Sequence, residues 1–229
     1  MNEGSRLLSV FVAPGKLFVD LEERASRWWL PLVILVLVVA AAAIAVRLFI
    51  PPEVWIENIR NNIASSGVAA NEEMLDMAMS RMQSPISILF TGLGGAIGQT
   101  AVSFLFALAF WAIFAIFGGK INFTKSVTVV TYTGLITALG IILVTVLSIS
   151  LQRLDIQTSL ALLPFLEPDT YLYRLAVQID FFAIWRVLVM GLGFSVLGSV
   201  SRFKGYALVI IPWLILAVGM AFVRVGISR

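Results

Sequence analysis

Residues 178–201 have the sequence QIDFFAIWRVLVMGLGFSVLGSVS, an apolar segment long enough to cross a bilayer as a helix. Asp180 opens it, and Arg186 lies six residues further on. At about 100° per residue, the small residues share one face, to which a second helix backbone can come close: Gly191, Ser195, Gly198 and Ser199. Because Arg186 and Gly193 share a different face, we expect this helix to touch neighbours on two sides and to lie in the middle of a bundle.

The two charges of this segment cannot pair with each other. Asp180 and Arg186 are separated by about 120° around a helix, unlike residues at i and i+4. Asp180 is expected at the membrane boundary, where it caps or complements the start of the helix. Arg186 lies about 9 Å deeper along the helix. It therefore either reaches back to the interface, bonds to carbonyls, Gln99 or a threonine, or binds an anionic ligand.

Composition assigns the chain to the membrane proteins. Its 229 residues are 60% hydrophobic and 13% charged, and the mean hydropathy is +0.99, which no ordinary soluble domain reaches. The chain has no cysteine and no histidine, which removes disulfides, thiol chemistry, the commonest general base and the commonest metal ligands. The pI near 9.5 reflects basic residues beside membrane segments and predicts no nucleic-acid partner.

The predicted fold is all-α, a polytopic membrane helix bundle of five transmembrane helices with added amphipathic interfacial helices. The expected spans are residues 30–50, 86–117, 124–150, 181–200 and 206–223. Residues 1–29 form a cytoplasmic, amphipathic N-terminal segment in the headgroup layer, and residues 30–229 form the membrane domain. Residues 51–85 and 151–180 are expected to be external loops that contain short helices, one of them capped by Asn71.

Glycines crowd the first half of the second span. The motif GLGGAIG at residues 92–98 lacks the spacing of a dinucleotide-binding loop and follows no strand. Gly94 and Gly98 are therefore predicted to serve helix packing, and Gln99 to be an interhelical hydrogen-bonding group or part of a polar path.

The first external loop is rich in methionine, at Met74, Met77, Met79 and Met82. Thioethers are soft ligands that suit copper(I), but methionine is also a helix former and an adaptable apolar filler. We expect an adaptable contact surface, with no metal and no cofactor.

Charge predicts the orientation. With the N-terminus inside, the inner side carries an excess of basic over acidic residues, as the positive-inside rule requires for short loops. The basic residues so placed are Arg6, Lys16, Arg24, Arg27, Lys120, Lys125, Arg202 and Lys204. The expected orientation has the N-terminus cytoplasmic and the C-terminus external.

Three stretches carry a resemblance to a known family. They are PGKLF at 14–18 followed by WWLP at 28–31, FGGKINFTKSVTVVTYTG at 117–134, and DFFAIWRVLVMGLGFS at 180–195. Together they resemble the bacterial branch of the Yip-one (Ypt-interacting-protein) domain family over nearly the whole chain. The resemblance implies a non-enzymatic protein of the bacterial cytoplasmic membrane with five membrane helices, N-terminus in and C-terminus out. Eukaryotic members are associated with Rab GTPases, but their DLYGP-like and Gly-Tyr motifs have no clear match here, so a GTPase partner is not carried over.

An enzyme is disfavoured because Ser195 has no base in sight and Asp180 alone lies near a span, whereas a membrane aspartyl protease needs two carboxylates. The sequence favours a non-enzymatic scaffold or accessory subunit that packs against the lipid bilayer and a membrane-protein partner or a second copy of itself (a homo-oligomer). The alternative is a small-molecule or lipid transporter or channel that uses Arg186 and Gln99 as intramembrane polar sites.

Overall fold

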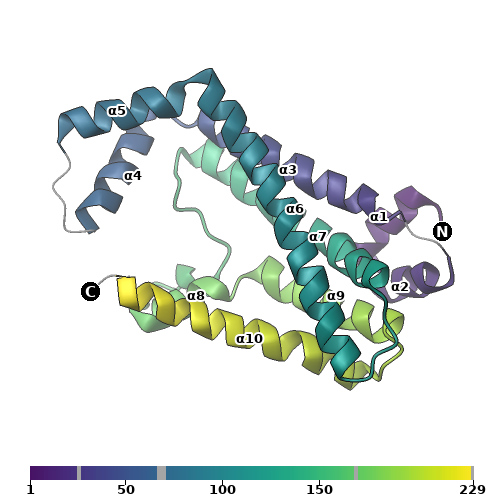
Figure 1. Cartoon of the computed structure of the whole chain (residues 1–229). Coiled ribbons are helices and arrows are strands. Elements are labelled where there is room, and N and C mark those ends of the chain that lie inside the picture. Colours follow the sequence, from purple (N-terminus) through teal and green to yellow (C-terminus); the bar gives the residue numbers. More distant parts are fainter. Residues whose placement is uncertain (25–26, 66–70, 168–169, 228–229) are drawn as a thin grey trace.

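The computed structural model describes residues 1–24, 27–65, 71–167 and 170–227, and Figure 1 shows the arrangement of its helices. In this part of the chain there is no β-strand, only an isolated bridge between Ser159 and Asp180. The α-helices are α1 (Glu3–Val12), α2 (Pro14–Glu23), α3 (Trp29–Phe49), α4 (Pro52–Ser65), α5 (Glu72–Gln83), α6 (Pro85–Ile116), α7 (Phe123–Leu151), α8 (Tyr171–Gln178), α9 (Phe181–Leu197) and α10 (Arg202–Ile227), with one 3-10 turn, η1 (Leu160–Leu162).

Four of these helices are long and apolar enough to cross a membrane: α3, α6, α7 and residues 202–222 of α10. The fifth apolar helix, α9, has 17 residues and is about 25 Å long, at the lower limit for a bilayer core. The predicted all-helical membrane fold is therefore confirmed, and four of the five predicted spans have the required length and composition. The remaining predicted span, 181–200, is shorter than expected because α9 ends at Leu197.

Polar side chains define where the helices begin. The Asn122 carboxamide accepts a hydrogen bond from the Lys125 amide at 2.8 Å at the start of α7. Asn71 caps α5 in the same way, as predicted. Just after the C-terminal end of α6, Gly118 takes a left-handed conformation with φ of 77°, which glycine adopts without strain. The chain then turns directly into α7.

The centre of the bundle is α7, and α9 contacts neighbours on two sides, as predicted from its two faces. Helix α7 packs against α3, α6 and α9 and contains the longest set of buried residues of any described helix. Helix α9 lies between α7, α10 and the N-terminal helix α2. The face with Gly191 and Ser195 contacts α10, and Gly193 on another face contacts Phe18 of α2.

The N-terminal helices α1 and α2 form a hairpin that packs on the bundle, α1 against α7 and α2 against α9. Their apolar side chains Val10, Leu17 and Phe18 are fully buried and belong to the main hydrophobic core. The Arg6 side chain, which is 3% exposed, donates from Nε to Asp20 Oδ2 at 2.7 Å and so joins the two helices. The hairpin therefore buries its apolar side in protein, and its position in the headgroup layer stays a prediction.

Helices α4 and α5 extend away from the bundle as an arm at one end, as Figure 1 shows. The arm contacts the start of α6 through α5. The second predicted external segment, after α7, contains η1 and α8, and α8 packs against α10. Residues 66–70, between α4 and α5, lie outside the described residues.

Candidate functional site

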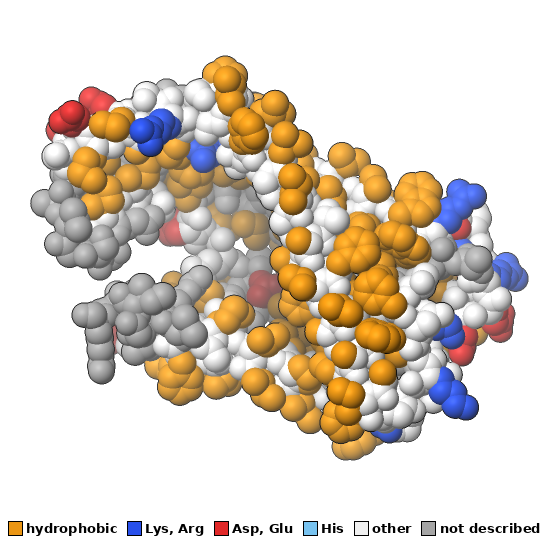
Figure 2. Space-filling model, in the orientation of Figure 1, with side chains coloured by type: hydrophobic (Ala, Val, Ile, Leu, Met, Phe, Trp, Pro, Cys, Tyr) orange, Lys and Arg blue, Asp and Glu red, His pale blue; other side chains and the backbone are white. Residues whose placement is uncertain are grey.

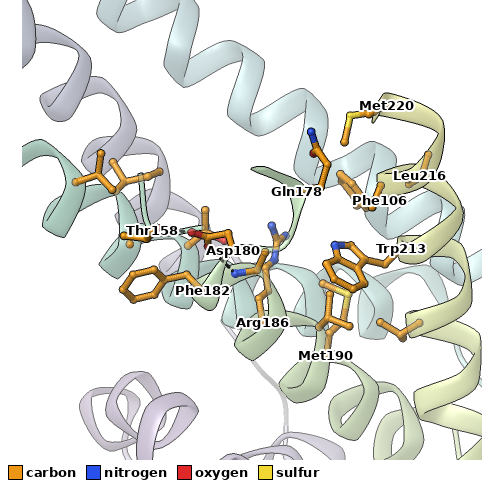
Figure 3. A pocket seen from close by; sticks show the side chains of 18 of the residues that line it. Phe106, Thr158, Gln178, Asp180, Phe182, Arg186, Met190, Trp213, Leu216 and Met220 are labelled. Carbon is orange, nitrogen blue, oxygen red and sulfur yellow. Dashed lines mark hydrogen bonds between the residues drawn. The ribbon is translucent and has the colours of Figure 1, made fainter. Parts of the chain in front are cut away.

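A cavity of about 510 Å³ lies among α6, α7, α9, α10 and the segment that leads into α9. Figure 3 shows the cavity with Arg186 and Asp180 on one side and Trp213, Leu216 and Met220 of α10 on the other. Its walls are mostly apolar. Two of its polar side chains, Thr137 and Thr145, come from α7, and the others gather toward the start of α9: Thr158, Gln178, Asp180 and Arg186. A volume of this size is typical of small-molecule and cofactor sites.

Arg186 enters this cavity from the second turn of α9. Its guanidinium carbon lies 5.9 Å from the centre of the Phe106 ring of α6, a cation–π contact. Its Nε is buried and has no hydrogen-bond partner, and none of the ion pairs among the described residues includes it. Arg186 was expected to find its partner on another segment of the chain. That partner is the ring of Phe106, which does not neutralise the charge of the guanidinium.

Asp180 lines the same cavity but already has donors for both carboxylate oxygens. Oδ1 accepts a hydrogen bond from the Ala183 amide at 2.9 Å, which caps α9 as predicted. Oδ2 accepts a hydrogen bond from the Thr158 hydroxyl. Asp180 and Arg186 thus share a cavity without forming an ion pair in the described structure, in agreement with their spacing along the helix.

Gln99 does not belong to this site. Its amide nitrogen donates to the Ser103 hydroxyl, one turn further along α6, at 3.1 Å, and Gln99 is absent from the cavity lining. The expectation that Gln99 either hydrogen-bonds another helix or shares a polar path with Arg186 is not met, because the side chain bonds within its own helix. The two residues that define the transport alternative are therefore not brought together.

The predicted packing residues fall into two groups. A Cβ added at Gly191 would come to 2.7 Å from Tyr206 of α10, and one added at Gly205 of α10 would come to 2.5 Å from the Ser195 Cβ. Gly191 and Ser195 therefore form the close contact between α9 and α10. Gly198 lies just beyond the last helical residue, where its backbone oxygen accepts a hydrogen bond from the Lys120 amide at 2.9 Å. It contributes to the end of α9 more than to a packing face.

Gly94 and Gly98 pack against nothing in the described chain, since a Cβ at either position would meet no atom within 4 Å. The close contact between α6 and α3 is made instead by Gly92, against Ile44, and by Gly95, against Val39. Both pairs lie on one helix, and the sequence could not tell which pair faces α3. The packing role predicted for Gly94 and Gly98 is thus not met within the chain.

The methionines of α5 do not gather on one side. Met74 and Met77 are 45% and 48% exposed, whereas Met79 is 8% exposed. Met79 and Met82 line a second cavity, of about 250 Å³, together with Arg47 and Trp55. Within the described residues no group of three or more His, Cys, Asp or Glu side chains could hold a metal ion. The four methionines are thus divided between an exposed pair and a pair that lines a cavity, and the adaptable contact surface stays a prediction.

Sequence reasoning missed the aromatic part of the cavity around Arg186. Phe106 and Trp213 belong to spans whose apolar residues all look alike in the sequence, and Thr158 lies in a loop 22 residues before Asp180. Arg186 and Asp180 gave signals of their own, as a cation inside an apolar helix and an acidic residue at its start.

The chain is similar to known proteins over almost its whole length. The sequence model described as the Yip1 domain matches residues 8–223. The protein named Membrane protein YknW, from Bacillus subtilis (strain 168), is 22% identical over 223 residues, covering 96% of this chain and 90% of that protein. No solved structure shows significant similarity to the chain.

Proposed function

Since the chain belongs to the Yip1 domain family of membrane proteins, we propose that it acts as a non-enzymatic scaffold or accessory subunit that binds the membrane helices of a partner protein. The family match supports a membrane role and supplies no catalytic group. The absence of histidine and cysteine from the sequence supports the same proposal.

The observation that carries the proposal is the free face of α6. Gly94 and Gly98 are four residues apart, so they lie on one face of this helix, and nothing in the described chain covers them. In lipid, glycine gains nothing by facing acyl chains, whereas two glycines at this spacing let a second helix backbone approach closely. Leu93 and Ile97, which lie beside them in the sequence, are also exposed and would surround such a contact.

The mechanism follows from this geometry. Helix α6 would supply a groove at Gly94 and Gly98, into which a helix of the partner packs by van der Waals contact. On another side of α6, the close contacts of Gly92 and Gly95 with α3 would keep this helix, and so the groove, in a fixed position. The partner is a membrane protein or a second copy of this chain.

The test replaces both free glycines by leucine and compares the variant with Gly219→Leu. Gly219 of α10 also has no atom within 4 Å of an added Cβ, so it controls for the change of glycine to leucine on an open helix face. Proteins are extracted in mild detergent from native membranes, and the copurifying proteins are quantified. We expect a stoichiometric partner, or the second copy, to be lost from Gly94→Leu/Gly98→Leu and retained by Gly219→Leu. Equal recovery with both variants would contradict the role of α6.

Location and orientation are part of this proposal. We place the chain in the bacterial cytoplasmic membrane with the N-terminus inside and the C-terminus outside, supported by the distribution of Lys and Arg. Because the sequence has no cysteine, single cysteines introduced at Glu3, Lys120 and Asp155 can be labelled without background. Labelling from outside only at Asp155 is expected. Labelling from outside at Lys120 would contradict the orientation.

A single cysteine at Ser201 tests whether α9 spans the membrane. Residue 155 lies before α9 and Ser201 follows it, so the two are expected on opposite sides. Labelling of both from the same side would mean that α9 does not cross.

A further inference from the structure

The cavity around Arg186 combines one charged end with a long apolar wall. Arg186 and Asp180 are the charged residues that line it. On the opposite side, Trp213, Leu216 and Met220 lie along α10 at helical spacing. A ligand that fits this lining has a compact polar group and an apolar part.

The charged residues of the cavity indicate which sign of charge the polar group of the ligand would carry. Asp180 is satisfied by the Ala183 amide and the Thr158 hydroxyl, and the start of α9 also favours its negative charge. Arg186 has a buried Nε without a partner and a ring, not an anion, beside its guanidinium. A buried charged donor left without an acceptor is costly in an apolar surrounding. The guanidinium fork matches the oxygens of phosphate in two parallel hydrogen bonds.

The position of the cavity defines where the ligand comes from. Its walls include α6 and α10, two helices long and apolar enough to cross the membrane. These helices come together at one end and diverge toward the other (Figure 1), and Figure 2 shows the molecule hollowed on the side where they diverge. The acyl chains of lipids can enter a gap that widens between two membrane-spanning helices. Arg186 lies about 9 Å along α9 from its first residues, within reach of the headgroup level for so long a side chain.

We propose that this cavity binds one acidic phospholipid, whose phosphate accepts hydrogen bonds from Arg186 and whose acyl chain lies against Trp213, Leu216 and Met220. A soluble anion would leave the apolar wall empty. A zwitterionic headgroup would bring an ammonium group close to the Arg186 guanidinium, where two positive charges repel each other. The site is separate from the free face of α6 at Gly94 and Gly98.

The experiment titrates the full-length protein in detergent with phosphatidylglycerol, phosphatidylethanolamine or inorganic phosphate, and counts bound molecules by native mass spectrometry. Arg186→Gln is compared with Arg47→Gln. Arg47 is a matched control, because it also lies near the end of a span, stacks on a ring (Trp55, at 5.0 Å) and has a buried nitrogen without a partner. We expect one phosphatidylglycerol per chain, bound about tenfold more weakly by Arg186→Gln and unchanged by Arg47→Gln.

Two further variants keep the test decisive if Arg186→Gln fails to fold. Arg186→Lys keeps the charge but loses the planar fork, so we expect an intermediate affinity. Leu216→Trp enlarges a half-exposed side chain of the lining and is expected to weaken the lipid without removing the charge. Four results would each overturn the proposal. The first two are an equal loss of phosphatidylglycerol affinity in Arg186→Gln and Arg47→Gln, and wild-type affinity in both Arg186→Lys and Leu216→Trp. The other two are displacement of the bound lipid by inorganic phosphate, and equal affinity of the wild type for phosphatidylethanolamine.

Discussion

The ring of Phe18 in α2 lies directly against Gly193 in α9, so that a Cβ added at Gly193 would come to 2.6 Å from the Phe18 Cζ. Phe18 is 0% exposed and belongs to the main core. The contact joins a short N-terminal helix to an apolar helix about 175 residues later in the chain. It makes the N-terminal hairpin part of the folded bundle.

This contact predicts that Gly193→Val separates α2 from α9. Extra atoms in a packed contact typically cost about 1–3 kcal/mol, so we expect a lower melting temperature in detergent and faster proteolysis within residues 1–24. Gly219→Val is the control, because an added Cβ there meets nothing within 4 Å. Equal melting temperatures for the two variants would show that the hairpin does not depend on this contact.

The contact between α9 and α10 predicts a second effect on stability. Gly191→Leu is expected to destabilise the fold by about 3 kcal/mol or more, because the new side chain would overlap Tyr206, including its Cα at 3.2 Å. A backbone atom cannot move aside as a side-chain tip can. Thermal unfolding in detergent measures the change, with Gly94→Leu as the comparison, since Gly94 has open space. An unchanged melting temperature for Gly191→Leu would argue against the observed packing.

Two buried hydroxyl groups are expected to differ in their effect on stability. Ser126 donates to the Ala107 carbonyl of another helix, α6, at 2.6 Å, whereas Thr133 donates to the Val129 carbonyl of its own helix at 2.8 Å. Loss of the interhelical bond in Ser126→Ala should cost about 1 kcal/mol. Thr133→Val should cost less, because the Val129 carbonyl keeps its backbone bond. Equal losses of stability in the two variants, measured by unfolding in mixed micelles, would mean that the interhelical hydrogen bond stabilises the fold no more than the intrahelical one.

Stability should fall in acid through Asp20. The Met1 ammonium, which donates to Asp20 Oδ1 at 2.6 Å, and the Arg6 guanidinium hold the pKa of this carboxyl below its ordinary value of 3.8. Because the folded-state pKa is lowered, this stabilisation is fully present above pH 3.8 and is lost as the pH falls through the lower folded-state pKa.

Melting temperatures recorded between pH 6 and pH 3 test this effect. Asp20→Asn should be less stable than the wild type at pH 6 and should lose less stability on acidification. Asp76→Asn, at an exposed position in α5, should follow the wild type. A parallel decline for the wild type and Asp20→Asn would exclude Asp20 as the group responsible.

The helices could be predicted from the sequence because their signals are local. Long apolar runs gave α3, α6 and α7 within about two residues of their bounds, and Asn71 and Asp180 were recognised as caps. These features depend on side chains within one or two turns of each other. The end of α9 at Leu197 was missed, because the segment remains apolar and small up to Ser201.

The candidate site was only partly predictable. Arg186 stood out because a cation within an apolar helix has few structural explanations. Phe106 and Trp213, which complete the cavity, could not be distinguished from the other aromatic residues of their spans. Their role depends on which helices meet, and hydropathy carries no information about that.

Composition and helical period are properties of the chain alone, so the sequence is enough to predict a helical membrane protein and to assign Arg186, Gly191 and Ser195 to particular faces of one helix. Tertiary packing, in contrast, puts α7 at the centre, buries the apolar side of the N-terminal hairpin in the bundle, and turns Gly92 and Gly95 rather than Gly94 and Gly98 toward α3. These outcomes depend on how each helix is rotated about its axis against its neighbours. In an apolar helix nearly every rotation offers hydrophobic side chains, and the close fit of specific pairs such as Phe18 and Gly193 selects among them.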